Sequence, residues 1–312
     1  MKPRVLQVGA LTPALEAALA ARFDVHPLWR EAAAKAFLAA RGAEFTAVAT
    51  SARYGADRAL IESLPSLKVI ASFGVGTDTI DLDAARASGV AVSNTPEVLN
   101  DCVADLAFGL LLDVARRLSA ADRFVRRGDW LEGGFPLATK VSGKKLGIVG
   151  LGRIGAAIAK RGGGFDMTVR YHNRRPVEGS PHGYEASLPA LAAWADFLVV
   201  ACSGGPATRH LVSAEVIDAL GPQGFLVNIA RGSVVDEAAL VAALLAGRIA
   251  GAALDVFEHE PNVPPALFGL DNVVLLPHIA SGTHETRKAM GDCVFANLQS
   301  WFDHGRLLTP VV

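Results

Sequence analysis

The feature that most constrains the fold of this chain is a β/α alternation that runs through the sequence twice. The first series contains four short apolar segments separated by amphipathic ones: RVLQVG, TAVAT, KVIASFG and GVAVSN. A long segment, expected to be one helix over 96–128, leads to the second series: KLGIVG, TVRYHN, FLVVAC, GFLVNIA, GAALDV and NVVLLPH. Strands that are apolar almost throughout are typical of parallel sheets covered on both faces. The sequence therefore predicts an α/β fold with two doubly wound, mainly parallel sheets.

The same alternation predicts where the domains begin and end. The second series is self-contained, whereas the terminal helix expected over 283–305 has no sheet of its own. We therefore expect a discontinuous domain formed by 1–97 and 284–312, and a continuous domain formed by 98–283. A chain of 312 residues is long enough to give each domain its own core.

Composition argues against several classes of partner and site. A net charge of -1 provides no electrostatic attraction for nucleic acid or an anionic membrane surface. Every long apolar run is interrupted by charges, so we expect no membrane span. The cysteines Cys102, Cys202 and Cys293 are far apart and outside any C-x-x-C spacing, which disfavours disulfides and a metal site. We expect no metal and a cytoplasmic location.

A glycine pattern at the start of the second series indicates a dinucleotide site. Gly150, Gly152 and Gly155 form G-x-G-x-x-G between the strand KLGIV and the helix RIGAAIAKR. In this context the first glycine permits a tight turn, the second admits a pyrophosphate, and the third lets helix pack on strand. The helix N-terminus would attract the phosphates. A glycine turn without a ligand is the alternative. The other loop residues are assigned to the same site: Leu151, Arg153 and Ile154.

The end of the next strand indicates which dinucleotide is bound. An NAD site needs an acidic residue there to accept from the ribose 2′-hydroxyl. Here the positions are Asn173, Arg174 and Arg175, and guanidinium groups pair with a 2′-phosphate. We therefore predict NADP(H) in preference to NAD(H), with a solvated basic loop as the alternative.

Polar side chains follow three later strands of the second series. Arg231 follows GFLVNIA, Glu260 follows GAALDV by a short loop, and His278 ends NVVLLPH. The carboxyl ends of parallel strands share one edge, so these residues are expected to converge. For a 2-keto acid, Arg231 could bind the carboxylate and carbonyl oxygen, and His278 could protonate that oxygen. Glu260 would stabilise the charged imidazole and orient it. Taken singly these are weak signals, since a histidine after a strand is more often structural.

In order and spacing, the motifs resemble the D-isomer-specific 2-hydroxyacid dehydrogenases, in particular the NADPH-dependent glyoxylate/hydroxypyruvate and hydroxyphenylpyruvate reductases. The resemblance runs nearly end to end: SFGVGTD, NTPEVLNDCVADLAFGL, GLGRIG, NIARGSVVDE, GAALDVFEHEP and NVVLLPHIASGT. It implies a Rossmann nucleotide domain over 98–283 and a flavodoxin-like substrate domain. It also implies catalytic roles for Arg231, Glu260 and His278.

The resemblance assigns further binding residues. It implies that the backbone of Gly74, Val75 and Gly76 holds the substrate carboxylate, and that Asp255 binds the nicotinamide carboxamide. The turn HNRR resembles that of the NADP-using branch, although Arg175 stands where many relatives have a hydroxyl. Two further residues of the matching motifs are assigned to the cofactor: Ile229 and Ser281.

The expected activity is NADPH-preferring reduction of small 2-keto acids such as glyoxylate and hydroxypyruvate. We expect a homodimer with the helix of about 96–120 at its centre, because that helix carries more apolar surface than one side of a single domain is expected to cover. One alternative is reduction of another 2-keto acid such as hydroxyphenylpyruvate. A second is a non-enzymatic corepressor or NAD(H) sensor of the same superfamily. A third, phosphoglycerate dehydrogenase, would have an acid in place of Asn173.

Overall fold

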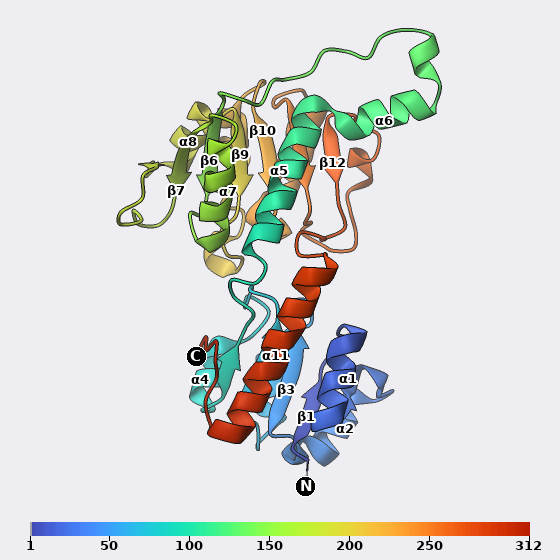
Figure 1. The fold of residues 1–312 in the computed structure, drawn as a ribbon, viewed down its shortest axis with the longest axis vertical. Coiled ribbons are helices and arrows are strands. Elements are labelled where there is room, and N and C mark those ends of the chain that lie inside the picture. Colours follow the sequence, from blue (N-terminus) through green and yellow to red (C-terminus); the bar gives the residue numbers. More distant parts are fainter. Residues whose placement is uncertain (1) are drawn as a thin grey trace. The chain divides into compact units, whose positions relative to one another are not determined.

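The computed structural model describes residues 2–312, which divide into two compact α/β units. One unit contains residues up to Leu99 together with Ser281–Val312, and the other contains Asn100–Ala280. These borders lie close to the expected 97/98 and 283/284. Each unit is built on one parallel sheet, which confirms the predicted fold class (Figure 1). Within residues 2–312, no helix is both long and apolar enough to cross a bilayer.

The first unit has a five-stranded sheet in the order β2-β1-β3-β4-β5, the strand order of flavodoxin-like folds. The strands are β1 (Arg4–Gln7), β2 (Asp24–Pro27), β3 (Ala47–Ser51), β4 (Val69–Phe73) and β5 (Ala91–Ser93). Its helices are α1 (Pro13–Arg22), α2 (Ala34–Arg41), α3 (Arg58–Glu62), α4 (Leu82–Ala87) and α11 (His284–His304). The edge strand β2 was not predicted, because its residues DVHP are only partly buried and lack an apolar run.

The terminal helix α11 packs on β4 and α1, so it belongs to the first unit. The Thr283 side chain caps its start by accepting from the Thr286 N–H, and Gly305 ends it in a left-handed conformation. Beyond the helix, the Val311 N–H donates to Val92 O and the chain runs along β5. The second segment of this unit is therefore held by both helix packing and sheet-edge hydrogen bonds.

The second unit has a seven-stranded sheet in the order β12-β11-β10-β9-β6-β7-β8. Counted from β6, this is the strand order of dinucleotide-binding folds with one strand added at the β12 edge. The strands are β6 (Lys145–Val149), β7 (Thr168–His172), β8 (Gly183–Tyr184), β9 (Phe197–Val200), β10 (Phe225–Asn228), β11 (Gly251–Leu254) and β12 (Val273–Leu275). The helices are α5 (Asn100–Arg116), α6 (Leu118–Arg126), α7 (Arg153–Gly163), α8 (Leu188–Trp194), α9 (Ala214–Leu220) and α10 (Glu237–Leu245).

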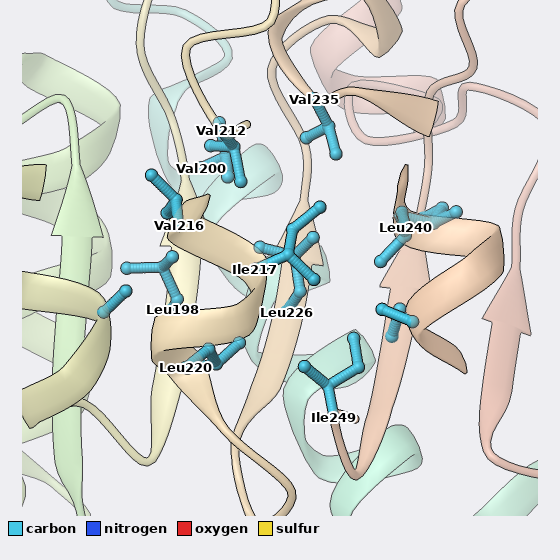
Figure 2. Close-up of a cluster of buried hydrophobic side chains, with 14 of the residues drawn as sticks. Leu198, Val200, Val212, Val216, Ile217, Leu220, Leu226, Val235, Leu240 and Ile249 are labelled. Atoms are coloured by element: carbon cyan, nitrogen blue, oxygen red, sulfur yellow. The ribbon is translucent and has the colours of Figure 1, made fainter. Parts of the chain in front are cut away.

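The core of this unit forms where helices cover the apolar strands. Figure 2 shows one such layer, in which Leu198 of β9 and Leu226 of β10 lie beneath Val216, Ile217 and Leu220 of α9. All five side chains are buried. Each buried leucine or isoleucine contributes about 1.5–3 kcal/mol relative to exposure, so this layer holds the strand ends rigidly in place.

The long helix predicted over 96–128 is two helices. It begins at Asn100, after Glu97 adopts a left-handed φ of 71°, and it breaks at Arg117, where φ is 56°. The Asp113 side chain accepts from the N–H and hydroxyl of Ser119, which caps the start of α6 across the break. Side-chain capping of this kind competes with helix continuation, and the periodicity of the sequence does not reveal it.

The apolar face of α5 is buried within its own unit, which corrects one argument for a dimer. The helix packs on α7, β10 and β11, and Phe108, Leu111 and Val114 are all at most 6% exposed. The surface that was expected to need a partner subunit is therefore already covered. The exposed apolar side chains of this region lie after α5 instead, in 118–137.

Candidate active site

The glycine loop connects β6 to α7 with the geometry that a dinucleotide loop requires. Gly150 has a φ of 99°, and a Cβ there would lie 2.6 Å from Cys202 Cα. A Cβ on Gly155 would lie 2.2 Å from Gly150 O, so only glycine lets the helix start so close to the strand. At Gly152 a Cβ would meet nothing within 4 Å. The loop is therefore closed by its first and third glycines and open at its second, where α7 begins.

The turn after β7 is joined to the glycine loop by Asn173. Its Oδ1 atom accepts from the Leu151 N–H at 2.7 Å, and its own carbonyl accepts from Tyr184 OH at 3.2 Å. Arg174 and Arg175 are exposed. Asn173 therefore braces the loop, and the two arginines are the cationic groups presented beside it.

A buried aspartate holds the segment that carries His278. Asp255, at the end of β11, is fully buried, and its two carboxylate oxygens accept from Ile279 N at 2.7 Å and Ala280 N at 2.8 Å. Burial raises the pKa of Asp255, opposed by these two amide donors and the charge of His278. The Asp255 carbonyl also accepts from His278 N at 2.8 Å. Three hydrogen bonds thus fix the backbone of 278–280.

His278 and Glu260 are in direct contact. His278 Nδ1 lies 2.8 Å from Glu260 Oε2, and both side chains are partly exposed at the carboxyl edge of the sheet. The other carboxylate oxygen accepts from Phe257 N at 3.2 Å. Burial acts to raise the pKa of Glu260, but the hydrogen bond and charge of His278, with smaller effects of Phe257 and Arg231, hold it below its usual value. Glu260 is therefore ionised at neutral pH. Because the carboxylate contacts Nδ1, the other ring nitrogen, Nε2, is not bound to Glu260.

Arg231 follows β10 on a loop whose backbone is held by the side chain of Asn228. Asn228, the last residue of the strand, is 1% exposed, accepts from Ala230 N and donates to Arg231 O. The Arg231 guanidinium donates to Ala230 O, and its charge reaches Glu260. Sequence reasoning missed Asn228; the available signal was one polar residue ending the otherwise apolar segment FLVN.

The glycine-rich loop of the first unit follows β4. Gly74 has a φ of 143°, and a Cβ there would lie 2.6 Å from Ala52 Cβ. Its N–H donates to Thr95 Oγ1 at 3.2 Å, while the Asn94 side chain donates to Val75 O at 2.8 Å. Side chains that follow β5 therefore hold the backbone of this loop in one conformation.

The remaining assigned residues divide by burial. Leu151 and Ile229 are buried, Ile154 and Ser281 are partly buried, and Arg153 is exposed at the start of α7. Ser281 begins the second segment of the first unit, outside the unit that carries the other cofactor residues.

Burial raises the pKa of the Cys202 thiol to about 11, so this group beside the glycine loop stays protonated. Among residues 2–312 no cluster of three or more His, Cys, Asp or Glu could hold a metal ion.

Comparisons with known proteins show which family the chain resembles. Residues 108–280 match the family model described as D-isomer specific 2-hydroxyacid dehydrogenase, NAD binding domain. The chain is 50% identical over 308 residues to hydroxyphenylpyruvate reductase of Plectranthus scutellarioides, covering 99% of this chain and 98% of the relative. It is 49% identical over 308 residues to glyoxylate/hydroxypyruvate reductase A of Arabidopsis thaliana, with the same coverage.

A solved structure is similar over the whole chain. It is the NADPH-dependent glyoxylate/hydroxypyruvate reductase of Sinorhizobium meliloti in complex with NADP and malonate, with a TM-score of 0.92 and 43% identity, covering 100% of this chain and 97% of that one. The named relatives are reductases, which confirms the predicted enzyme class. With a family model that matches more than half of its length and relatives that match nearly all of it, the chain belongs to the D-isomer-specific 2-hydroxyacid dehydrogenases.

Proposed function

We propose that this protein is an NADPH-preferring reductase of small 2-keto acids such as glyoxylate and hydroxypyruvate. The observation that carries the proposal is the 2.8 Å contact between His278 Nδ1 and an ionised Glu260, with Arg231 close enough to influence that carboxylate. An oriented imidazolium beside a guanidinium is suited to a substrate that has a carboxylate next to a carbonyl.

The proposed mechanism assigns one task to each group. Arg231 binds the carboxylate and the carbonyl oxygen through its planar fork. The backbone of Gly74, Val75 and Gly76 is assigned to binding of the substrate carboxylate. His278 donates the proton that the carbonyl oxygen needs as negative charge develops on it. Glu260 orients the imidazole by the bond to Nδ1. When bound, the nicotinamide cofactor supplies the hydride.

The glycine loop and the turn after β7 fit such a cofactor. The open position at Gly152 and the N-terminus of α7 suit the pyrophosphate, with Arg153 beside them. Arg174 and Arg175 would pair with the 2′-phosphate. Asp255 would bind the nicotinamide carboxamide, and its hydrogen bonds to Ile279 N and Ala280 N hold the His278 segment at the same place.

Substrate choice is tested by one steady-state panel. Glyoxylate, hydroxypyruvate, pyruvate and hydroxyphenylpyruvate are compared with NADPH and with NADH. We expect the highest kcat/KM for glyoxylate or hydroxypyruvate with NADPH. Similarity to the Plectranthus scutellarioides enzyme makes hydroxyphenylpyruvate the main alternative substrate. A higher kcat/KM for hydroxyphenylpyruvate than for glyoxylate or hydroxypyruvate would contradict our substrate assignment. Absence of turnover with every pair would contradict an enzymatic role.

The cofactor preference is tested by changing the turn after β7. The double variant Asn173→Asp with Arg174→Ala should weaken NADPH binding by roughly tenfold to a hundredfold, the effect of losing one charge-assisted phosphate contact. An aspartate at 173 still accepts from the Leu151 N–H, so the loop itself should remain braced. Dissociation constants for NADPH and NADH, measured by fluorescence titration, check the loss of NADPH affinity and whether the braced loop still binds a dinucleotide. Retained NADPH preference would place the 2′-phosphate elsewhere.

We also propose that the protein is a homodimer, through the apolar side chains after α5. In the second unit, α6 and the segment after it project from the sheet (Figure 1). This region exposes five large apolar side chains: Leu118, Val125, Trp130, Leu131 and Leu137. A soluble monomer rarely keeps so much apolar surface together, and a second copy of the chain offers a matching one. Light scattering at micromolar concentration should give a dimer mass, and Trp130→Asp with Leu137→Asp should give a monomer. A monomeric wild type would contradict the proposal.

A cytoplasmic location is proposed on the basis of cysteine chemistry. The three cysteines are free thiols, and free thiols persist in reducing compartments. Cell fractionation of the tagged protein checks this, and a particulate or organellar location would contradict it.

A further inference from the structure

A partly buried acidic side chain with an arginine and a histidine as partners lies next to the backbone that follows Arg231. Only 11% of the Glu258 side chain is exposed, and its Oε1 atom accepts from Arg209 Nη2 at 2.6 Å and His210 Nε2 at 3.0 Å. Burial acts to raise the pKa of Glu258, but these two donors outweigh it and hold the pKa below its usual value. Glu258 is thus an ionised carboxylate that is largely covered by protein and is paired with these two groups.

The segment that carries His210 is paired with the segment that follows Arg231. His210 N donates to Ser233 O at 2.8 Å, and Val212 N donates to Val234 O at 3.0 Å. His210 has a left-handed φ of 49°. A residue other than glycine keeps this conformation only where its surroundings enforce it, and here the backbone bond and the side-chain bond both do so.

The same carboxylate lies on the segment that carries Glu260. A Cβ on Gly232 would lie 1.8 Å from the carbonyl carbon of Phe257, so the backbone after Arg231 touches the backbone that precedes Glu258. Phe257 N in turn donates to Glu260 Oε1 at 3.2 Å. Glu258 therefore lies at the junction between the loop of Arg231 and the segment that orients the Glu260 carboxylate.

We propose that Arg209, His210 and Glu258 form a positioning cluster that sets the placement of Arg231 relative to the Glu260–His278 pair. None of the three touches the reacting atoms of the proposed mechanism. Their effect comes through geometry, because a displacement of about 1 Å in a catalytic group can cost a hundredfold in rate. The inference rests on the proposed function, and its test contains a measurement that does not depend on turnover.

The primary variant is Glu258→Gln, which keeps the shape of the side chain and removes its charge. The matched control is Asp218→Asn, which removes one carboxylate charge from the Arg248 ion pair of the same unit, away from the site. We expect Glu258→Gln to lower kcat/KM for 2-keto acid reduction by about tenfold to a hundredfold. NADPH affinity should stay at the wild-type value. The control Asp218→Asn should match wild type in both kcat/KM and NADPH affinity.

A second measurement separates positioning from simple loss of stability. The charged groups near the His278 imidazole are Glu260 and Asp255, and Arg231 acts on Glu260. If the cluster holds Glu260 against His278, Glu258→Gln loosens that contact, and the proton on Nδ1 loses its short hydrogen bond to Glu260. Histidine-selective NMR follows the signal of this proton in the free protein at a fixed pH. A merely structural role would lower the melting temperature and leave this signal unchanged.

His210→Asn provides an independent variant if Glu258→Gln fails to fold, because asparagine tolerates the left-handed backbone. It should change kcat/KM and the NMR signal of the His278 Nδ1 proton in the same directions, whereas Glu258→Asp should restore most of the activity. If the folded variants match Asp218→Asn in kcat/KM and in this signal, the inference is overturned. A wild type without turnover contradicts the proposed function alone, since the NMR signal still tests the cluster.

Discussion

Replacing His278 by asparagine is expected to lower kcat for 2-keto acid reduction by about 10²–10⁴-fold, the usual effect of losing a general acid. KM should change little, because the proton is needed only as charge develops on the carbonyl oxygen. Asparagine is preferred to alanine because His278 has a φ of 55°, which asparagine tolerates. Stopped-flow and steady-state kinetics with saturating NADPH measure both constants. Near-normal turnover would show that another group donates the proton.

The control for this prediction is Glu260→Gln, which keeps the imidazole and removes the adjacent charge. The pKa of Glu260 is held below its usual value, so its carboxylate is ionised throughout the working range and stabilises the imidazolium. Glu260→Gln leaves the proton donor in place and removes the charged partner of Nδ1, so kcat should fall by less than it does in His278→Asn. In the wild type, kcat should fall toward the Glu260→Gln value as the pH drops through the lowered pKa of Glu260, because the carboxylate is then protonated. An identical acid limb of the kcat profile in the two enzymes would contradict the role given to Glu260.

Replacing Arg231 by alanine is expected to lower kcat/KM by roughly 10²–10³-fold, the size of effect seen when a preorganised donor to developing negative charge is removed. Both constants should worsen, because the guanidinium contacts the substrate carboxylate before reaction and the carbonyl oxygen during it. The fold should survive, since the loop is held by Asn228 and by the packing of Gly232 on Phe257. Steady-state kinetics and a thermal melt together check this prediction.

Arg231→Lys is the matched control, because it keeps the charge and loses the planar fork. We expect partial recovery of KM and little recovery of kcat. If Arg231→Ala has the kinetics of wild type, the substrate carboxylate is bound by other groups, and the assignment of this arginine fails.

Much of the fold could be predicted from local sequence patterns. The apolar strands, the glycine motif and the terminal helix bounded by Thr283 and Gly305 each carry their signal within a few residues, and they occur where expected. The short edge strands β2 and β8 were missed, because their residues are only partly buried and lack an apolar run. The break at Arg117 was missed because it depends on a cap from Asp113, a competing local bond that periodicity does not record.

The candidate catalytic residues were proposed from the sequence alone, because Arg231, Glu260 and His278 each follow a strand of one parallel sheet, and parallel strands bring their carboxyl ends together. What supports those residues was decided only by the tertiary structure. Asp255 and Asn228 proved to be buried braces. Asp255 accepts from backbone amides of the distant segment that carries His278, which no spacing reveals, and Asn228 holds the backbone of the loop that follows it at Ala230 and Arg231. The apolar face of α5 proved to be covered by its own sheet, because burial depends on which surfaces pack together and not on how apolar they are.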